Sequence, residues 1–571
     1  MDTIIQGYLD RFIDEFELTQ YKTADNFERF CIYSLLKNEL SYLDSNDIDE
    51  ISVGKNKGID GICLAIDGNP VTNIRMIEDL NTKKRNFGVT LYFLQAKTSA
   101  HFKDSEIANF CDTVIDFLKE TPDYDLTPKT AEYHSMYMEI LKQLSYLKTF
   151  NCKLFYCSTG IWDGQMTCAT TIKNKKKLLV GTGNFKSDQG DTVDIITVDN
   201  EKLRKLFDKA NQPLNTEFTF AQKIPLEGID GVKEAYIGIL PFKEFKKVII
   251  DEETGKLKPL FGDNVRDFLG VEEEVNAKIN KTLQDRQFDL FQLLNNGITI
   301  IAEDNKGRLN KFILTNSQVV NGCQTSNVLF LNKDTDDIDD LSIPVKLIIT
   351  DNADIRDSII VSTNNQAEIR EEQLLALTSF QKNLEQFYKS MPDGIHYERR
   401  KAQYSNELNI KKSAIVDIRE QIKSYVAMFL EEPHAVSGYF GKVYRDRSSI
   451  IFVKNHTHDP YYLSAFAHYK FKQLLAAKKL ERRFNKARYH LLMLFRKISE
   501  PSRKPDPSNK DMKGYCEDIL KIIRDEKNCL KNFLLATKII DNSEIDFDDQ
   551  KEIYKKSTTN TLLEKFDKKY K

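Results

Sequence analysis

The sequence predicts a multidomain α/β protein with an N-terminal α/β domain (1–215), a central α+β domain (216–405) and a mostly helical C-terminal region (406–571). Three observations predict this organisation. Apolar strand patterns alternate with helical patterns in the first range, glycine-bearing polar phrases separate apolar runs in the second, and helical periodicity dominates the third. The chain has 571 residues, 41% of them hydrophobic, which is enough for about three domains with buried cores.

Composition argues against a membrane or secreted protein. No apolar run approaches the roughly twenty residues that a membrane span needs, and the N-terminal segment MDTIIQGYLDRF lacks the pattern of a signal peptide. The nine cysteines contain no CxxC pair, so we expect reduced and mostly buried thiols. These features predict a cytoplasmic protein.

Four residues of the N-terminal domain form a pattern that suits a phosphodiesterase. Gln95 and Lys97 end the apolar run LYFLQAK, and because strand side chains alternate, both should leave the same face of one strand. Asp60, in GIDGI, begins a second apolar run that is typical of a buried strand. Glu28 lies in a segment whose apolar residues recur at helical spacing. A packed helix could therefore bring a carboxylate to the two strands.

Cleavage of a phosphodiester needs a divalent cation that polarises the phosphoryl group, and carboxylate and amide oxygens suit such a cation. We therefore expect Asp60, Gln95 and Glu28 to bind Mg²⁺ or Mn²⁺. In the competing interpretation, the Asp-Gly pair is an ordinary turn and the QxK segment is a solvated strand end. Glu39 and Glu50 are alternatives to Glu28, although Glu50 lies in an acidic, solvated-looking segment.

The order of a helical glutamate, GxDG and an apolar strand ending in QxK resembles the PD-(D/E)xK nucleases, in their Mrr-like restriction branch. The resemblance covers about the first hundred residues and implies a restriction-endonuclease-like αβ core with a mixed sheet. It also implies that Lys97 positions or activates the attacking water. Gln95 stands where a second acid is commonest, and an amide binds metal more weakly than a carboxylate. DNA is the expected substrate by this resemblance alone, and cutting both strands of a duplex would favour a homodimer.

The central domain contains five polar phrases set between apolar runs: NVRDFLG, LLNNGITII, NSQVVNGCQTSNVLF, IPVKLII and VSTNNQAEIR. In this order they resemble the abortive infection phage resistance family, abbreviated AIPR, over residues 235–405. The resemblance implies a bacterial protein of anti-phage or mobile-element defence. Families of this kind commonly carry a nuclease domain in front, which agrees with the N-terminal pattern.

The phrase SQVVNGCQTSNVLF predicts a strand, a tight Asn-Gly turn and a helix, and free N–H groups at a helix start bind anions. VNGCQT is also similar to a turn of ParB-like nucleotide-binding domains, but Asn321 replaces the acid and Thr325 replaces the arginine. We therefore expect a phosphate pocket, with ATP as a candidate nucleotide. Its expected lining is Arg266, Asn295, Asn296, Asn321, Gly322, Gln324, Thr325, Asn364, Gln366 and Arg399. Alternatively, these amides cap helices and turns.

The C-terminal region has a local excess of basic residues. Between Lys442 and Lys513 there are 18 Lys and Arg against 6 Asp and Glu, a local net charge of +12 in a chain whose total is −3. Such a stretch favours sequence-independent, salt-sensitive binding of nucleic acid. The residues expected to carry it are Lys478, Lys479, Arg482, Arg483, Lys486 and Arg488. In the alternative, this charge pairs with the acidic remainder of the protein.

Together these expectations describe a metal-dependent defence endonuclease that acts on nucleic acid, with a companion defence protein as a further candidate partner. A competing class is a binding protein whose N-terminal domain is catalytically idle and whose central domain senses a nucleotide or a phage component. Cleavage of RNA is a third hypothesis, because metal ligands do not distinguish ribose from deoxyribose.

Overall fold

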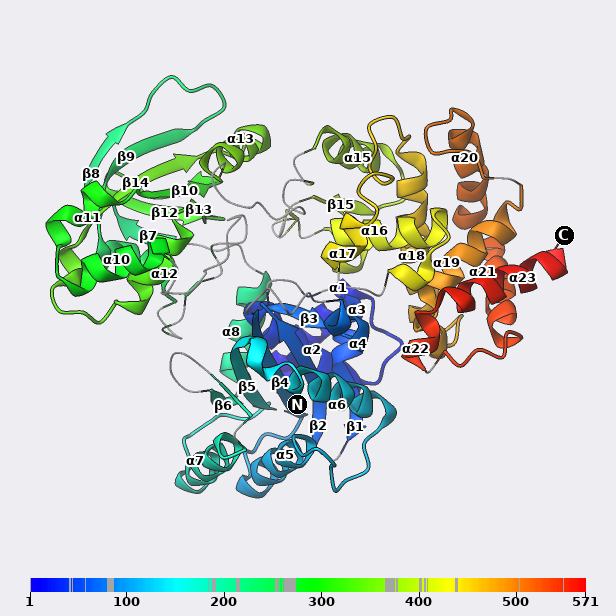
Figure 1. The fold of residues 1–571 in the computed structure, drawn as a ribbon, viewed down its shortest axis with the longest axis horizontal. Helices are drawn as coiled ribbons and strands as arrows, with labels where there is room; N and C mark the ends of the chain where they lie inside the picture. Colours follow the sequence, from blue (N-terminus) through cyan, green and yellow to red (C-terminus); the bar gives the residue numbers. More distant parts are fainter. Residues whose placement is uncertain are drawn as a thin grey trace. The chain divides into compact units, whose positions relative to one another are not determined.

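The computed structural model describes residues 2–40, 43, 45–56, 58–79, 87–182, 184–186, 192–211, 216–251, 255, 257, 258, 260, 274–364, 375, 378–399, 403, 404, 407, 409–436, 440–502, 504–547 and 549–570. The protein is mixed α/β with a helical C-terminal region, as the sequence predicts (Figure 1). It divides into two compact units, one of residues 1–210, 380–400 and 407–571 and one of residues 211–379 and 401–406. The N-terminal and C-terminal regions thus form a single unit.

The N-terminal part of the first unit is built on one mixed sheet of order β1-β2-β4-β5-β6, with β3 paired to β2 (Figure 1). The strands are β1 (Ser52–Asn56), β2 (Ile59–Ile66), β3 (Asn69–Val71), β4 (Phe87–Lys97), β5 (Leu147–Ser158) and β6 (Val193–Val198). Strands β1 and β4 are antiparallel to β2, whereas β4, β5 and β6 are parallel. Parallel neighbours need long crossovers, and helices supply them here.

Helices cover both faces of this sheet. The helices α1 (Thr3–Phe16), α2 (Thr23–Glu39) and α8 (Asn200–Asn211) share one core with Tyr92 and Leu94 of β4. The helices α5 (Asp104–Phe117), α6 (Pro128–Leu141) and α7 (Met166–Val180) share a second core with Leu91 and Phe93. Strand β4 is therefore apolar on both sides along most of its length, and its buried polar side chain, Gln95, comes near its carboxyl end.

Helix α1 illustrates how the sequence builds one of these layers. Its buried residues Ile5, Leu9, Phe12 and Phe16 recur every three or four positions, so they form one apolar stripe. The carboxylate of Asp2 accepts a hydrogen bond from the Ile4 amide at 3.2 Å and caps the helix start. The stripe packs onto α2 and α8, in the core of the sheet face that they share.

The loops that follow β4 and β5 are held together at the carboxyl ends of these parallel strands. The hydroxyl of Ser158 donates a hydrogen bond to the carbonyl oxygen of Ser99 at 2.8 Å. Gly160 lies against the backbone of Ala100, because a Cβ built on Gly160 would be 2.0 Å from the Ala100 carbonyl oxygen. A glycine at this position therefore fixes how closely the two loops approach.

The C-terminal part of the first unit is a layer of helices. It contains α15 (Ser379–Ser390), α16 (Ile418–Phe429), α17 (Phe440–Arg445), α18 (Asp459–Ala476), α19 (Arg488–Ser499), α20 (Asp511–Arg524), α21 (Glu526–Asp541), α22 (Gln550–Ile553) and α23 (Lys556–Tyr570). The two-stranded parallel pair β15 (His396–Glu398) and β16 (Ile415–Asp417) accompanies them. Helix α16 packs against both α18 and α19, and α19 packs against α21.

The second unit is α+β, with a sheet of order β13-β10-β14-β9-β8 and a smaller sheet of order β11-β12-β7. Its strands are β7 (Thr216–Thr219), β8 (Gln222–Pro225), β9 (Glu234–Pro241), β10 (Ile298–Ala302), β11 (Asp304–Asn305), β12 (Lys311–Thr315), β13 (Gln318–Asn321) and β14 (Ser342–Ile349). Its helices are α9 (Phe242–Ile249), α10 (Glu274–Gln284), α11 (Phe288–Leu294), α12 (Cys323–Leu331) and α13 (Ala353–Asn364). No described helix of either unit is long and apolar enough to cross a membrane.

Replacement of Gly160 by alanine is expected to destabilise the first unit by about 1–3 kcal/mol, because the new methyl group overlaps the Ala100 backbone. The midpoint of thermal unfolding measures this loss. The matched control is Gly7→Ala in α1, where a Cβ meets no atom within 4 Å. Alanine there should raise stability by up to about 1 kcal/mol through helix propensity, so equal midpoints for the two variants would contradict the loop packing.

Candidate functional site

The pairing of β2 with β4 brings Asp60 and Gln95 to the same end of the sheet. The paired residues extend to Gly61 and Leu94, and Asp60 and Gln95 are the next residues on their strands. Even-numbered residues of β2 and odd-numbered residues of β4 face the core that contains α5. Because strand side chains alternate, Asp60, Gln95 and Lys97 therefore leave the sheet on this one face.

Asp60 is fixed by a contact between the two strands. Its Oδ2 accepts a hydrogen bond from the backbone amide of Ala96 at 2.8 Å. Burial raises the pKa of Asp60, and the Ala96 hydrogen bond and the charge of Lys97 offset this effect only in part. Ionisation of this carboxyl group therefore costs more than it does in water, and a bound cation would favour the ionised form.

Gln95 is the buried polar side chain of the site, with 3% of its surface exposed. Its Oε1 is buried and accepts no hydrogen bond from the part of the chain that the structure describes. Its Nε2 lies against Gly58, where a Cβ would come within 3.0 Å and where φ is +103°. A buried oxygen without a donor costs about 1–3 kcal/mol, and a hard cation bound to that oxygen would remove the cost.

Lys97 and Glu28 lie on different elements and on different sides of the sheet. Lys97 ends β4, and its positive charge favours the ionised forms of Asp60 and Glu106. Glu28 is partly buried in α2, on the opposite helix layer. Burial raises the pKa of the Cys31 thiol, and the negative charges of Asp60 and Glu28 both add to this rise. Both carboxylates therefore lie within electrostatic reach of one buried thiol.

The two alternatives to Glu28 are engaged elsewhere. Glu39 forms an ion pair with Lys153 of β5. Glu50 lies 4.0 Å from the ammonium group of Lys129 and 3.8 Å from the guanidinium group of Arg488. These ion pairs involve none of the residues at the ends of β2 and β4.

The donor set at this site is unusual for a protein metal centre. Among the described residues, no group of three or more His, Cys, Asp or Glu side chains could hold a metal ion. Asp60 offers a carboxylate oxygen and Gln95 an amide oxygen on one face, while the expected carboxylate of Glu28 comes from the opposite helix layer. Oxygen donors of these types fit Mg²⁺ or Mn²⁺, and the unpartnered oxygen of Gln95 is the observation that favours a cation.

In the second unit, Gly322 starts the helix α12 in the left-handed conformation, with φ at +97°. A Cβ on Gly322 would come within 2.7 Å of Ile298, so glycine is required on both conformational and steric grounds. The strand β13, the turn and the helix α12 thus follow one another as the sequence predicts. Gln324 and Thr325 lie in the first turn of this helix.

Several amides predicted to line the phosphate pocket have partners within the protein. Asn295 donates to the carbonyl oxygen of Phe291 at 2.9 Å and caps the end of α11. The amide of Asn321 donates to the carbonyl oxygen of Thr363 at 3.1 Å. The side-chain oxygen of Gln324 accepts from Asn276 at 2.8 Å. These contacts are the capping and turn chemistry of the alternative interpretation, and Asn296 is exposed beside them.

Other members of the predicted pocket are placed differently or lie outside the described residues. Arg399 belongs to the first unit, where its Nε forms a buried ion pair with Glu385 at 3.1 Å. Arg266, Gln366 and the side chain of Asn364 lie outside the described part of the chain. The phosphate pocket as a whole stays a prediction.

Most of the basic side chains expected to bind nucleic acid face an acidic side chain of the same unit. The closest pairs are Arg483–Asp541 at 2.6 Å, Lys479–Glu526 at 3.5 Å, Arg488–Glu50 at 3.8 Å, Lys486–Glu132 at 3.9 Å and Arg482–Asp49 at 4.0 Å. Lys478 is exposed and has no acidic partner among the described residues. Much of the local excess of positive charge is thus balanced within the protein.

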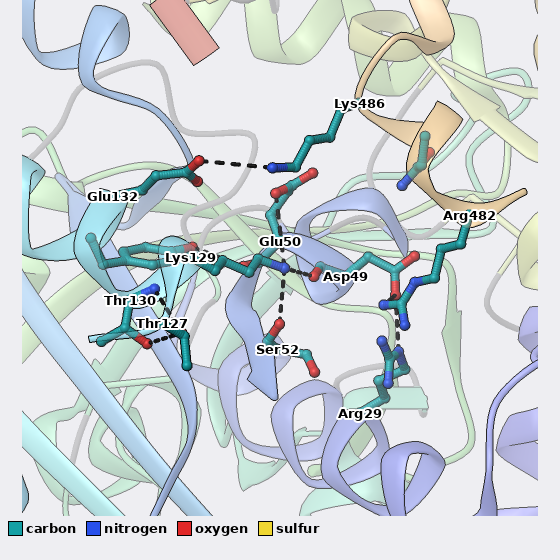
Figure 2. Close-up of polar contacts among 12 residues, drawn as sticks. Arg29, Asp49, Glu50, Ser52, Thr127, Lys129, Thr130, Glu132, Arg482 and Lys486 are labelled. Carbon is teal, nitrogen blue, oxygen red and sulfur yellow. Dashed lines mark hydrogen bonds and ion pairs between the residues drawn. The ribbon is translucent and has the colours of Figure 1, made fainter. Parts of the chain in front are cut away.

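Figure 2 shows the junction where the helix α3 (Ser45–Ile51) and β1 meet the C-terminal helices. The guanidinium group of Arg29 pairs with Asp49 at 2.9 Å, and Arg482 approaches the same carboxylate from the C-terminal side. Lys129 donates to the backbone oxygens of Asp49 and Ser52. Charge complementarity therefore joins segments that are more than four hundred residues apart in sequence.

Tyr21 lies at the centre of this junction. Its ring centroid is 3.6 Å from the guanidinium carbon of Arg29 and 4.4 Å from that of Arg482. Its hydroxyl donates to Asp49 at 2.8 Å. Burial raises the pKa of Tyr21 to about 12, and the charge of Asp49 adds to the effect. Two cation–π contacts and a hydroxyl shared between both oxygens of Asp49 thus organise a cluster that the sequence pattern did not reveal.

The family model of AIPR proteins matches residues 261–569, more than half of the 571 residues. The chain belongs to the AIPR family. The matched AIPR region begins within the central domain and continues through the C-terminal helices, beyond the residues 235–405 that carry the resemblance in the sequence. No curated protein and no solved structure shows significant similarity to this AIPR chain. The N-terminal sheet lies outside the matched region.

Removal of the Arg29 guanidinium group should loosen the junction. The variant Arg29→Met removes the buried guanidinium group that contacts both Asp49 and Tyr21. It is expected to cost about 2 kcal/mol, less than loss of a fully buried pair because Asp49 is 22% exposed. Thermal unfolding measures the loss. The control Lys142→Met removes an exposed pair with Glu139 and should cost no more than about 0.5 kcal/mol. Equal losses of stability in the two variants would mean that the cluster stabilises the fold no more than an exposed ion pair does.

Proposed function

We propose that this protein is a metal-dependent endonuclease of the PD-(D/E)xK type that acts in defence against phage. Membership of the AIPR family suggests the role in abortive infection and phage defence. The observation that carries the nuclease proposal is the buried, unpartnered oxygen of Gln95 beside Asp60, on the sheet face that also bears Lys97. A buried acceptor without a donor is expensive unless a bound donor or a cation satisfies it, and a cation is the ligand that suits an acidic neighbour such as Asp60.

The order of the elements supports this proposal. The helix α2 carries Glu28, β2 carries Asp60, and β4 ends in Gln95-Ala96-Lys97 before the helix α5 begins. This is the order of the helix, strand, strand and QxK motif in the Mrr-like nucleases that the sequence resembles. Both strands are central in the sheet, which gives the side chains rigid supports, as a catalytic site requires.

The four residues divide into metal ligands and one positioning residue. Asp60, Gln95 and Glu28 would hold Mg²⁺ or Mn²⁺, which when bound supplies the positive charge that polarises a phosphodiester. The Ala96 amide keeps the Asp60 carboxylate oriented through its hydrogen bond. Lys97, two residues beyond Gln95 on the same face, would orient water or the scissile phosphate. Its ammonium group also offsets the negative charge that collects as the phosphate approaches.

DNA is the proposed substrate, and the support for it is the resemblance to the Mrr-like branch. The internal pairing of the C-terminal basic residues limits how many of them can neutralise phosphates at one time. Binding of the substrate therefore draws mainly on residues close to the catalytic strands. A weak dependence of affinity on salt is expected for so few phosphate contacts.

Replacement of Lys97 by alanine is expected to lower the rate of metal-dependent DNA cleavage by about a hundredfold or more, because the loss of one positioned electrostatic group has effects of this size. The measurement is cleavage of plasmid, linear duplex, single-stranded DNA and RNA by the full-length protein in Mg²⁺ or Mn²⁺, with EDTA as the metal-free condition.

The control Lys142→Ala removes an equally charged but exposed side chain just after the end of α6 and should cleave like the wild type. Unchanged cleavage by the Lys97→Ala protein would refute the assignment. Cleavage of RNA and not of DNA would support the assigned site and would show that the substrate is RNA. A folded protein that cuts nothing under any of these conditions would favour the sensor class.

Metal binding should be visible without catalysis. Saturation with Mn²⁺ at one hundred times the Kd should stabilise the wild type by about 2.7 kcal/mol, because the metal binds only the folded state. Asp60→Asn should abolish this gain. In the absence of metal, the same variant should be at least as stable as the wild type at neutral pH, since it removes a carboxylate that burial makes costly to ionise.

The pH dependence of metal binding follows from the direction in which the pKa of Asp60 is shifted. Because its folded pKa is raised, the protonated form is favoured, and metal binding must lose more affinity on acidification than at an ordinary aspartate. The metal-induced rise in the unfolding midpoint should therefore fade at a higher pH than the usual Asp pKa of about 3.9 predicts. If the metal-induced rise in the unfolding midpoint stays constant down to that pH, Asp60 is not a ligand of the metal.

A further inference from the structure

A cavity of about 700 Å³ lies in the first unit between the N-terminal helices and the C-terminal helices. Its wall is formed by the end of α1, the start of α2, the end of α18, the segment after α18 and the exposed side of α21. A volume of this size is typical of small-molecule sites, which lie between about 300 and 1,000 Å³. It is separate from the Asp60 site and from the phosphate pocket predicted in the second unit.

Three lysines of the wall have no partner for their charge within the part of the chain that the structure describes. The ammonium groups of Lys22, Lys478 and Lys538 make no ion pair or hydrogen bond with the described residues, and all three side chains are exposed. The wall has five acids, and four of them are already neutralised by basic partners: Asp49 by Arg29, Asp541 and Glu481 by Arg483, and Glu17 by Lys411. The fifth, Asp25, forms no ion pair with the described residues and offsets one of the three lysines. The positive charge left over comes from three different elements and surrounds one cavity, which favours an anionic ligand.

A second observation concerns the polar wall of the cavity. The side-chain oxygen of Gln20 is buried and accepts no hydrogen bond from the described part of the chain. Such an acceptor requires an N–H or O–H donor, and the amino and hydroxyl groups of a nucleotide offer such donors. The ligand that suits this cavity thus carries both negative charge and a hydrogen-bond donor.

The third observation is apolar surface inside the same cavity. Leu534 of α21 is 41% exposed, and Leu475 of α18 and Leu480 lie in the same wall. Leu534 and Lys538 are four residues apart on one helix and therefore lie on the same face of it. A planar base could pack on these leucines while its phosphates reach the lysines.

We propose that this cavity binds a nucleotide. Its phosphates contact Lys22, Lys478 and Lys538, its base packs against the leucines, and an amino or hydroxyl group of the base or sugar donates to Gln20. Arg482 and Asp49 also line the cavity and belong to the charged junction of Figure 2, so the bound nucleotide lies against the contact between α3 and the C-terminal helices. The proposal does not depend on nuclease activity.

Calorimetric titration of the full-length protein with ATP and GTP, without metal and at low salt, tests this. At least one of the two should bind. The double variant Lys478→Ala/Lys538→Ala should weaken that binding about tenfold or more, because two charge-assisted contacts are lost. The matched control Lys513→Ala/Lys521→Ala removes two exposed lysines of α20 outside the cavity and should bind like the wild type.

The variant Gln20→Leu separates a nucleotide from a simple anion. It should weaken binding of the nucleotide and leave binding of inorganic pyrophosphate unchanged. Unfolding midpoints establish that each variant is folded. The proposal is overturned if neither nucleotide binds, if pyrophosphate binds as tightly as the nucleotide and Gln20→Leu changes neither, or if the double variant and its control are equally impaired. Binding of a single-stranded oligonucleotide that the double variant Lys478→Ala/Lys538→Ala loses and that neither nucleotide displaces would also overturn it.

Discussion

Burial of both faces of the N-terminal sheet is the constraint on which the first unit depends. Strand β4 is covered by the layer of α1, α2 and α8 on one side and by that of α5, α6 and α7 on the other. Polar side chains can leave such a strand only where the helices end or where a ligand satisfies them. The carboxyl end of β4 is such a place, and there Asp60, Gln95 and Lys97 come together on one face.

The second organising principle is charge complementarity within one chain. A basic C-terminal stretch and an acidic N-terminal segment meet at the cluster of Tyr21, Arg29, Asp49 and Arg482. The near-neutral total charge therefore hides two complementary surfaces that neutralise each other on folding. Because most of these pairs are partly exposed, each contributes little to stability, but together they select how the helices pack on the sheet.

The sequence predicts local features of this protein well and long-range pairings poorly. The period of two along LYFLQAK places Gln95 and Lys97 on one face, and the apolar stripe of α1 follows from its helical spacing. The partners of Arg482 and Lys486 could not be predicted, because ion pairs between distant segments leave no periodic signal in one sequence. For the same reason the pattern did not reveal Gln20 or the cavity beside it, and it marked Arg399 as a pocket residue although Glu385 binds it.

The first unit is discontinuous in sequence, since residues 380–400 and 407–571 complete what residues 1–210 begin. A ribosome makes the sheet first and the helices that pair with Asp49, Glu50 and Glu132 last, after the whole second unit has emerged. The loop that must close spans more than 150 residues, and closure of so long a loop carries an entropic cost and slows folding. The N-terminal sheet thus acquires its full set of contacts only after synthesis of the C-terminal helices. For a host cell, this delay means that a truncated or stalled chain would lack the assembled junction.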